Sequence, residues 1–434
     1  MHDNPLSAFT NASLPHQGSA GISLAVVGAG VVGLCVALEA QRRGHHVTLI
    51  DHTAPGKATS YGNAGYLATE IIDPLGTPDV LRAAPKLWLN PKGPICTPWR
   101  YIAKAIPWYW RFLNAAQAEP AQRGTDMIHQ LNQAAVGAWQ RTLADINASA
   151  LLIKGGHLVV WENTQKRDEA HQLIEKMHRY DIPCEFVDAE RLAQLEPELS
   201  LSLSHAVFFP ESHRLTDPYE VCRALFDAFS AGGGVFINAK VDDVHPSSNT
   251  HIDLRIAAQT QRFDKVALCA GVWSKQLLER VGITVPLEAE RGYHVTFPHD
   301  AARIHHTVLS ADRKLVLSPL NAGLRAVGMS EIGGTTLPAI KKRYRVLREH
   351  TKGLLPKLFD NPQLESTEWM GYRPSFPDSL PVIDLHPMYS RLSFAFGHQH
   401  LGITQAAISA ELLLDKIEQR PSLIPLDALR VDRF

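Results

Sequence analysis

A glycine pattern near the start of the chain is the first group of residues with recognisable chemistry. Residues 28–33 read Gly-Ala-Gly-Val-Val-Gly and follow an apolar run at residues 22–27. In such a pattern the first glycine makes a tight turn, the second lets the backbone approach a pyrophosphate, and the third allows close helix packing. Asp51 lies further along the chain, where a carboxylate accepts hydrogen bonds from ribose hydroxyls and disfavours a 2′-phosphate. The pattern predicts a dinucleotide site, and the alternative is a tight turn that binds nothing. The predicted contacts are Asp51 together with Gly28, Ala29, Gly30, Val31, Val32 and Gly33.

These residues need a βαβ unit to hold them. The apolar residues 22–27 predict a buried strand, residues 31–43 predict a helix, and residues 47–50 predict a second strand. Gly44 is placed to end the helix. Free N–H groups at the start of this helix, together with its dipole, would favour an anion such as a diphosphate.

A loop of small residues follows the acid. Residues 58–65 read Ala-Thr-Ser-Tyr-Gly-Asn-Ala-Gly, and their amides and hydroxyls could line more of the diphosphate or a flavin ring. The alternative is a plain surface loop. With this loop the sequence resembles the D-amino-acid oxidase superfamily of FAD enzymes, most closely the bacterial D-amino-acid dehydrogenase and D-hydroxyproline dehydrogenase branch.

The resemblance runs from about Ser23 to Ile417 and includes Ser-x-x-Asn-Ala-Gly at residues 60–65. It implies an α/β plus α+β fold, in which a Rossmann-like FAD-binding domain is interrupted by an antiparallel-sheet substrate domain. We expect the FAD to be noncovalent, because no cysteine or histidine stands out as a linkage site. The implied FAD contacts in this part of the chain are His52, Ser60, Asn63, Ala64 and Gly65.

An arginine is the predicted anchor for the substrate. Residues 369–381 resemble the Gly-x-Arg-Pro segment of the family, whose arginine grips the substrate carboxylate, and Arg373 occupies that place. A guanidinium can hold a carboxylate with two parallel hydrogen bonds, worth roughly 1.5–3 kcal/mol for a charged contact. The alternative is a salt-bridging arginine locked by Pro374.

A turn near the C-terminus resembles the family's Gly-His-x-x-x-Gly-x-Thr element, which wraps the pyrimidine end of the flavin. A helix N-terminus there would stabilise the negative charge that develops on flavin reduction. His398 and His400 have no further ligands beside them in the sequence, so we expect no metal. His400 is also a candidate catalytic residue. The predicted FAD contacts in this turn are His400, Leu401, Gly402, Ile403 and Thr404.

Further contacts come from the middle of the chain. Val241 matches the family position whose backbone meets the adenine, and Ala270 and Gly271 match its Ala-Gly return to the dinucleotide. Residues 291–293 read Arg-Gly-Tyr and resemble an element that borders the catalytic cavity. Tyr293 is therefore a candidate catalytic residue, with packing in a strand as the alternative.

The predicted domains are discontinuous. We expect residues 1–20 to be a disordered tail. The FAD-binding domain is expected at residues 21–75, 150–165, 205–280 and 365–425. The substrate-binding domain and inserted helices are expected at residues 76–149, 166–204 and 281–364.

Residues 74–107 form a segment that contains many prolines and is followed by a group of aromatic residues. Seven prolines in residues 74–107 predict an irregular segment without long helices, followed by a helix at residues 125–147. Core packing is the usual explanation of such an aromatic cluster, and the alternative is a docking or membrane-surface patch. The aromatic residues are Trp88, Trp99, Trp108, Tyr109, Trp110 and Phe112.

The composition excludes several classes of protein. An apolar fraction of 45% with 20% charged residues is typical of a folded chain, and the formal net charge is −1. Because the chain has no run of Lys or Arg, we expect no nucleic-acid partner. Five widely spaced cysteines predict reduced thiols. We therefore expect a cytoplasmic protein, and the resemblance to the dehydrogenase branch implies peripheral attachment to the inner membrane as the alternative.

The resemblance implies oxidation of a D-amino acid. Hydride transfer from Cα–H to flavin N5 gives an imino acid, which hydrolyses to a 2-oxo acid and ammonia. Electrons are expected to pass to a quinone, another acceptor or an electron-accepting partner subunit. Residues 369–381 also resemble D-hydroxyproline dehydrogenases and opine oxidase subunits, so a cyclic imino acid or an N-alkyl amino acid is the alternative substrate. A non-catalytic NAD-binding Rossmann protein is the remote alternative.

Overall fold

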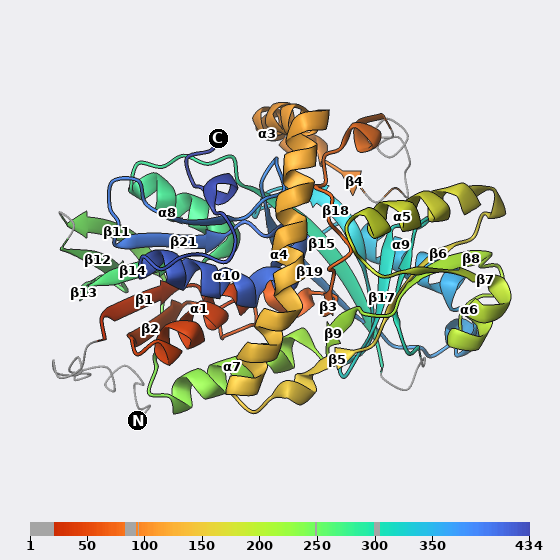
Figure 1. The fold of residues 1–434 in the computed structure, drawn as a ribbon, viewed down its shortest axis with the longest axis horizontal. Helices are drawn as coiled ribbons and strands as arrows, with labels where there is room; N and C mark the ends of the chain where they lie inside the picture. Colours follow the sequence, from red (N-terminus) through yellow and green to blue (C-terminus); the bar gives the residue numbers. More distant parts are fainter. Residues whose placement is uncertain (1–20, 83–92, 94, 248–249, 299–303) are drawn as a thin grey trace, which may run out of the picture.

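The computed structural model describes residues 21–82, 93, 95–247, 250–298 and 304–434. The tail predicted for residues 1–20 and the predicted aromatic residue Trp88 lie outside the described residues. Two sheets lie side by side, one toward each end of the longest axis, and a long helix runs between them (Figure 1). None of the helices in the described ranges is long and apolar enough to cross a bilayer.

The first sheet has six strands in the order β10-β2-β1-β14-β21-β20. Neighbouring strands run parallel, except that β20 is antiparallel to β21. Near-continuous apolar runs suit such a sheet, because both of its faces are covered. The strands are β1 (Ser23–Val27), β2 (His46–Asp51), β10 (Val235–Asn238), β14 (Lys265–Leu268), β20 (Val382–Leu385) and β21 (Leu392–Phe396).

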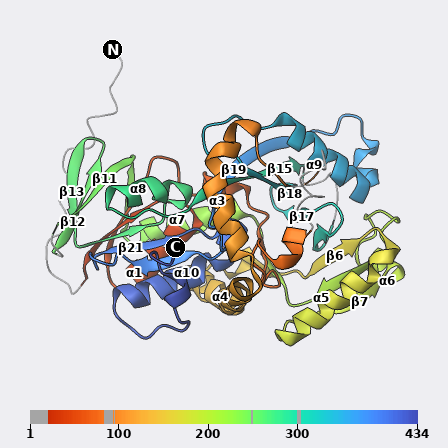
Figure 2. The same ribbon diagram turned by 90° about the horizontal axis from the view of Figure 1, so that it is seen from above.

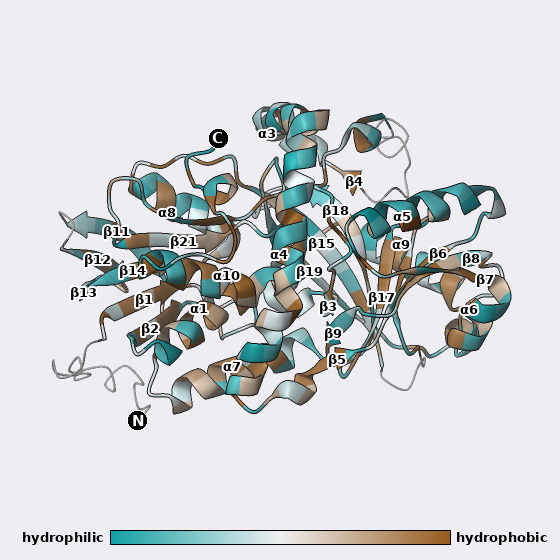
Figure 3. Cartoon of the chain, in the orientation of Figure 1, coloured by the Kyte–Doolittle hydropathy of each residue, from teal (hydrophilic) through white to brown (hydrophobic). Residues whose placement is uncertain are grey.

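Helices cover one face of this sheet and a small meander covers the other. The helices α1 (Val31–Arg42), α4 (Ala118–Asp145), α7 (Pro218–Ala231) and α10 (Gly402–Ile417) share one hydrophobic core. A second core joins the sheet to β11 (Val241–Ser247), β12 (His251–Ile256), β13 (Gln259–Phe263) and α8 (Ser274–Arg280). Helix α10 is largely brown in Figure 3, as expected for a helix buried in a core.

The second sheet has nine strands, in the order β19-β15-β18-β17-β16-β6-β8-β7 with β4 beside β18. Its pairs are antiparallel except for β16 with β6 and β18 with β4. Helices α5 (Arg167–Arg179), α6 (Ala189–Leu195) and α9 (Lys341–Leu354) pack against it. The strands are β4 (Ile95–Cys96), β6 (His157–Trp161), β7 (Glu185–Asp188), β8 (His205–Phe209), β15 (Glu288–Phe297), β16 (Thr307–Ser310), β17 (Leu315–Leu320), β18 (Gly323–Ile332) and β19 (Thr367–Ser375).

Short elements connect these layers. A three-stranded sheet of β3 (Tyr66–Leu67), β9 (His213–Leu215) and β5 (Leu152–Lys154) lies below the junction of the two large sheets (Figure 1). The 3₁₀ helices are η2 (Thr59–Gly62), η3 (Trp99–Tyr101), η4 (Ser149–Leu151), η5 (Thr164–Lys166), η6 (Gly271–Trp273), η7 (Pro356–Asp360), η8 (Gln399–Leu401) and η9 (Asp427–Leu429).

The chain crosses between the large sheets more often than predicted. Strands β6, β8 and β19 lie in segments expected in the FAD-binding domain, yet they pair within the nine-stranded sheet. Helix α4 lies in a segment expected in the substrate domain, yet it packs in the core of the six-stranded sheet. These boundaries were wrong because the periodicity of a segment predicts its type of element, and not the sheet that it joins.

The segment rich in proline contains a helix that the sequence analysis did not predict. Helix α3 spans Ile102–Ala115 and has Pro107 inside it. Proline removes one helical N–H and crowds the carbonyl four residues before it, which disfavours but does not forbid a helix. In this helix, Pro107 lies on the exposed side.

Candidate active site

The turn between β1 and α1 is as tight as the glycine pattern predicts. Gly28 has φ +109°, and a Cβ there would lie 2.5 Å from the carbonyl oxygen of Cys269. A Cβ on Gly33 would lie 1.8 Å from the carbonyl oxygen of Gly28. Glycine at both positions therefore lets the start of α1 approach the strand ends. At Gly30 an added Cβ would meet only Ser60 Oγ, at 3.3 Å, and this glycine lines the pocket.

Asp51 is fixed at the end of β2, at the edge of the same pocket. Its Oδ2 accepts a hydrogen bond of 2.8 Å from the Ala29 N–H, and its Oδ1 accepts one of 2.8 Å from the Thr53 N–H. His52 Nδ1 lies 3.3 Å from Asp51 Oδ1. The carboxylate is held beside the glycine turn, where a ribose would follow a diphosphate.

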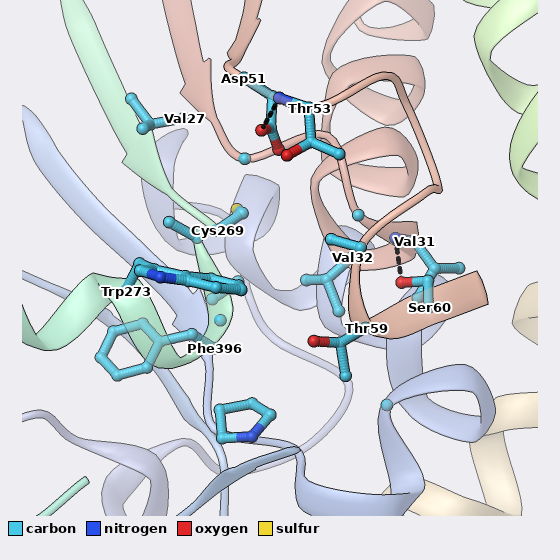
Figure 4. Close-up of a pocket in the computed structure, with 18 of the residues that line it drawn as sticks. Val27, Val31, Val32, Asp51, Thr53, Thr59, Ser60, Cys269, Trp273 and Phe396 are labelled. Atoms are coloured by element: carbon cyan, nitrogen blue, oxygen red, sulfur yellow. Dashed lines mark hydrogen bonds between the residues drawn. The ribbon is translucent and has the colours of Figure 1, made fainter. Parts of the chain in front are cut away.

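The loop of small residues folds against the start of α1. Ser60 Oγ accepts a hydrogen bond of 3.0 Å from the Val31 N–H, and Thr59 Oγ1 donates one of 2.9 Å to the carbonyl of Tyr372. Figure 4 shows Asp51 and Thr53 at one end of the pocket, with Thr59 and Ser60 facing Trp273 and Phe396 across it. The loop therefore joins the glycine turn to strand β19.

Most of the predicted FAD contacts line this elongated pocket. They come from the turn between β1 and α1, the start of α1, the end of β2 and the residue after it, the loop of small residues, the start of β11, η6 with the residue before it, and the start of α10. They are Gly28, Gly30, Val31, Val32, Asp51, His52, Ser60, Asn63, Val241, Ala270, Gly271, Gly402 and Ile403.

The other predicted contacts lie elsewhere. Ala29 donates to Asp51 and Gly33 packs beneath the turn, so both support the pocket from behind. Ala64 and His400 line an adjoining cavity instead. Gly65 donates to Asn63, Leu401 is buried, and Thr404 Oγ1 accepts from the Ala68 N–H at 3.0 Å.

Several pocket residues were missed by the sequence analysis. Trp273 follows the predicted Ala270-Gly271 return, and its ring lies edge-on to that of His52 at 6.5 Å. Thr53 lies two residues after the predicted acid, a signal that could have been used. Other missed lining residues include Cys269, Gln276, Leu277, Pro374, Phe396 and Gln399.

A second cavity of about 520 Å³ adjoins the first. Both are lined by Thr59, Asn63 and Gln399, so the two spaces meet at these residues. The volume is within the range of small-molecule sites. The polar side chains that line this second cavity include Arg373, Glu290, His400 and Ser330.

Arg373 and Glu290 form an ion pair in this cavity. They are direct neighbours on β19 and β15, and Arg373 Nη1 donates to Glu290 Oε1 at 2.9 Å and to the Met329 carbonyl at 3.2 Å. Both bonds use Nη1, so Nη2 and Nε have no hydrogen-bond partner in the described part of the chain. The guanidinium lies against Gly292, where an added Cβ would be 2.5 Å from Nη2. A glycine at this position makes room for the guanidinium.

Glu290 is charged although it is buried. Ser375 Oγ donates to its Oε2 at 2.8 Å, which completes the pairing of both carboxylate oxygens. Burial alone would raise the pKa of Glu290, but Arg373, Ser375 and His400 together bring that pKa below its ordinary value. The cavity thus holds a carboxylate and a guanidinium with no net charge between them.

The two histidines of the C-terminal turn have different surroundings. Burial lowers the pKa of His400 to about 4, with Glu290 raising it and Arg373 lowering it further. His400 is therefore neutral near pH 7. His398 is bonded to Ser409 Oγ at 2.9 Å inside the core, and burial lowers its pKa to about 3. Across the described ranges no three His, Cys, Asp or Glu side chains are grouped to hold a metal ion.

Tyr293 lines the second cavity, but its hydroxyl is engaged. It donates to Glu331 Oε2 at 2.6 Å and accepts from the Ile340 N–H at 3.2 Å. Glu331 also pairs with Arg291 at 2.7 Å, inside the protein. Burial and the contact with Glu331 raise the pKa of Tyr293. These hydrogen bonds give the Tyr293 hydroxyl a structural role. A catalytic role for Tyr293 stays a prediction.

Residues 23–416 match the DAO family, described as FAD dependent oxidoreductase. The chain belongs to this family. It is 32% identical to the D-amino-acid oxidase of Bradyrhizobium diazoefficiens over 95% of this chain and 99% of that one. It is 28% identical to D-amino acid dehydrogenase 2 of Ralstonia nicotianae, over 93% of this chain and 98% of that protein.

Solved structures with a similar fold also match nearly the whole chain. Glycine oxidase from Geobacillus kaustophilus superposes with a TM-score of 0.75 and 18% identity, over 95% of this chain and 99% of that one. The predicted fold, with a Rossmann-like FAD-binding part and a second part built on a largely antiparallel sheet, is confirmed. The glycine turn, Asp51 and the elongated pocket fit FAD, the cofactor of this family, which replaces the NAD-binding alternative.

Proposed function

We propose that this FAD dependent oxidoreductase oxidises D-amino acids to imino acids, which hydrolyse to 2-oxo acids and ammonia. The observation that carries the proposal is the position of Arg373, whose side chain lines a cavity that meets the FAD pocket and whose hydrogen bonds in the described part of the chain use Nη1 alone. The relatives named D-amino-acid oxidase and D-amino acid dehydrogenase, which match nearly the whole chain, support the same substrate class.

The protein's own groups bind and orient the substrate. Arg373 binds the α-carboxylate through its free nitrogens, and Glu290 holds the guanidinium in place through Nη1. This contact fixes the Cα–H bond relative to the FAD pocket. FAD, when bound, accepts the hydride from Cα. The protein must also favour the uncharged form of the substrate amine.

His400 is the group best placed to act on the amine. It lines the same cavity as Arg373 and Glu290. With a pKa of about 4 it is a weak base, so we assign it a hydrogen bond from the substrate amine rather than full proton abstraction. The proton is then released to solvent.

The acceptor we propose is a quinone or another carrier other than oxygen, in line with the dehydrogenase relatives. The oxidase relative makes oxygen the competing acceptor. The secondary-amine substrates, D-hydroxyproline and opines, would use the same carboxylate anchor.

The test is an activity assay with purified holoenzyme and paired substrates. D- and L-alanine, D-hydroxyproline and an opine are each supplied with a soluble quinone under nitrogen, or with air alone, and reduction of the quinone or consumption of oxygen is measured for all four. Ammonia and 2-oxo acid are measured as well for the two alanines, because the secondary amines release no ammonia. The proposal predicts turnover of D-alanine, none of L-alanine, and faster turnover with quinone than with air. Turnover of only the secondary amines would move the substrate class to the alternative, and equal inactivity with all four would contradict the proposal.

A further inference from the structure

The second cavity contains a cation that has no partner. Among the described residues, the charged side chains that line it are Asp73, Glu290, Lys314 and Arg373. Arg373 pairs with Glu290, and Asp73 pairs with Lys176. Lys314 Nζ makes no hydrogen bond or ion pair with any residue that the structure describes. The cavity therefore has a second positive side chain besides Arg373, and this one is free to meet a ligand.

The carboxylates near Lys314 are engaged elsewhere. Those whose charges act on Lys314 belong to Asp312 and Glu169. Asp312 Oδ1 lies 2.9 Å from Lys166 Nζ, and its Oδ2 accepts from the Glu162 N–H at 2.8 Å. Glu169 Oε1 lies 3.6 Å from the same Lys166 Nζ. Because Lys166 takes both carboxylates, neither forms an ion pair with Lys314.

Lys314 is crowded by protein and is still reached by solvent. Its side chain is exposed, yet burial lowers its pKa from the ordinary value of a lysine. Both observations fit a side chain at the wall of an open cavity. A carboxylate that bound there would favour the charged form of the lysine and offset the cost of its burial.

The strand register brings Lys314 close to the carboxylate anchor. Lys314 directly precedes β17, where Leu315 is paired with Gly328 of β18. The Lys314 carbonyl oxygen would lie 3.2 Å from a Cβ added to Gly328. One further step in this register reaches Met329, at the usual strand spacing of about 4.8 Å. The Met329 carbonyl accepts from Arg373 Nη1 at 3.2 Å.

The two cations thus belong to opposite sides of β18. Strands β19, β15, β18 and β17 lie side by side in this order (Figure 2). Arg373 reaches β18 from β19, across β15, and Lys314 adjoins β18 from the start of β17. A ligand in the cavity can therefore contact both side chains only if it carries two groups that bind cations.

The turn itself gives no reason for a lysine at this position. Lys314 has φ +52°, and its N–H donates to the Ser310 carbonyl at 2.9 Å in the turn between β16 and β17. Glycine or asparagine adopts this left-handed conformation with less strain. Strain of this kind is found at functional sites, where another role of the side chain compensates for it.

We propose that Lys314 binds a second carboxylate of the substrate, so that the preferred substrates are amino acids with two carboxylates. The inference rests on the proposed function, in which Arg373 takes the α-carboxylate. Lys314 Nζ donates charge-assisted hydrogen bonds to the other carboxylate. Two kinds of substrate carry it: D-glutamate and D-aspartate on the side chain, and opines on the nitrogen. D-alanine lacks this group and is a poorer substrate.

The wall around Lys314 supports recognition by charge. From β16 and β17 the cavity is lined by Leu309, Leu315 and Val316, which pack against methylene groups and offer no side-chain hydrogen bond. An uncharged amide beside them gains little, whereas a carboxylate gains the contact with Lys314. The comparison of D-glutamate with D-glutamine therefore isolates this contact, because the two side chains have nearly the same shape.

The first test compares kcat/KM for D-glutamate and D-glutamine, using holoenzyme and a soluble quinone. Wild type is expected to favour D-glutamate by about 10- to 100-fold, as a charged hydrogen bond would give. The ratio should fall to about one in Lys314→Met and should return in Lys314→Arg, which restores the positive charge. Lys352→Met is the matched control, because Lys352 is exposed on α9 and lines neither cavity.

A second substrate pair locates the carboxylate. N-(carboxymethyl)-D-alanine carries it on the nitrogen, and N-ethyl-D-alanine is the uncharged counterpart. A preference for the first of these that depends on Lys314, with D-glutamate and D-glutamine equal, would support the proposal and assign the second carboxylate to the nitrogen. A preference for D-glutamate assigns it to the side chain.

A binding measurement separates this proposal from the proposed function. Glutarate and pentanoate have the same chain length and differ by one carboxylate, and neither has an amine to oxidise. Titration of the holoenzyme, followed by the flavin spectrum, gives both Kd values. Glutarate should bind about 10- to 100-fold more tightly than pentanoate to wild type, and about equally to Lys314→Met. If this preference holds although no amino acid is oxidised, the proposed function fails and the role of Lys314 stands.

Either of two results overturns the proposal. One is equal binding of glutarate and pentanoate to wild type, together with no preference for the charged member of either substrate pair. The other is a preference for the second carboxylate that persists in Lys314→Met, since another group would then bind it.

Discussion

Glu290 Oε1 lies 2.9 Å from Arg373 Nη1, across neighbouring strands of the nine-stranded sheet. The two interpretations offered by the sequence for Arg373, a salt-bridging arginine and a carboxylate anchor, are therefore compatible. The salt bridge uses Nη1 of the guanidinium, and the Arg373 side chain also lines the cavity.

Arg373→Ala should raise the KM for a D-amino acid by about 10- to 100-fold, because a charged bidentate contact is worth roughly 1.5–3 kcal/mol. Flavin content should not change. Steady-state kinetics measure this effect, with Arg262→Ala as the control, since Arg262 pairs with Asp253 on the surface of the small meander. An unchanged KM in Arg373→Ala would remove this residue from the carboxylate role.

Glu290→Gln should bind a non-oxidisable carboxylate such as benzoate more tightly, by about tenfold, because the competing negative charge beside Arg373 is gone. The change in the flavin spectrum on titration gives the Kd. Glu368→Gln is the matched control, because Glu368 pairs with Arg348 near the surface. Equal affinity in Glu290→Gln and wild type would show that the ligand does not sense this charge.

Gly33→Ala should abolish flavin binding and lower the free energy of unfolding, because its Cβ would lie 1.8 Å from the Gly28 carbonyl oxygen. The flavin-to-protein absorbance ratio and urea unfolding measure the two effects. Gly137→Ala is the control: it lies in α4, its Cβ would meet only Arg141 Nη1 at 3.3 Å, and it should stabilise by about 0.5–1 kcal/mol. A flavin-replete Gly33→Ala protein would contradict the packing described for the turn.

Glu70 should make stability depend on pH. It is buried, accepts from Tyr66 Oη at 2.8 Å, and has its pKa raised by burial from 4.5 to about 7. His157 beside it is neutral, because burial lowers its pKa to about 3. In the unfolded chain Glu70 ionises at a lower pH than in the folded protein. This contribution to stability is therefore present in acid and is lost as the pH rises toward 7.

Glu70→Gln should remove this dependence. Between pH 4.5 and pH 8 the free energy of unfolding of wild type should fall by about 3 kcal/mol relative to the variant. Urea unfolding at both pH values gives the difference. Parallel pH profiles of wild type and variant would show that Glu70 is not held protonated.

The local elements were predictable, whereas their partners were not. Strands β1 and β2 agree to within one residue at each end with the strands predicted at residues 22–27 and 47–50, and the predicted βαβ unit forms, because apolar runs and glycines act over a few residues. The Arg373–Glu290 pair joins residues 83 positions apart, and its strand register is set by the whole sheet. No local pattern marks Glu290 as a site residue, so only the three-dimensional structure could identify it.

Helix α3 shows a different limit of the sequence analysis. The prolines of this segment, Pro107 among them, predict that no long helix forms, and the sequence groups the aromatic residues into one cluster. The side that each tryptophan takes depends on the contact between Trp108 and Ser375, which lie 267 residues apart.

The most direct test of the central claim is an anaerobic titration of the purified yellow holoenzyme with D-alanine and, separately, with L-alanine. We predict that D-alanine bleaches the visible band of the oxidised flavin and that L-alanine does not, and that the Arg373→Ala variant needs far more D-alanine for the same bleaching. A flavin that stays oxidised with D-alanine and the other D-amino acids, or that is bleached equally by both enantiomers, would contradict it.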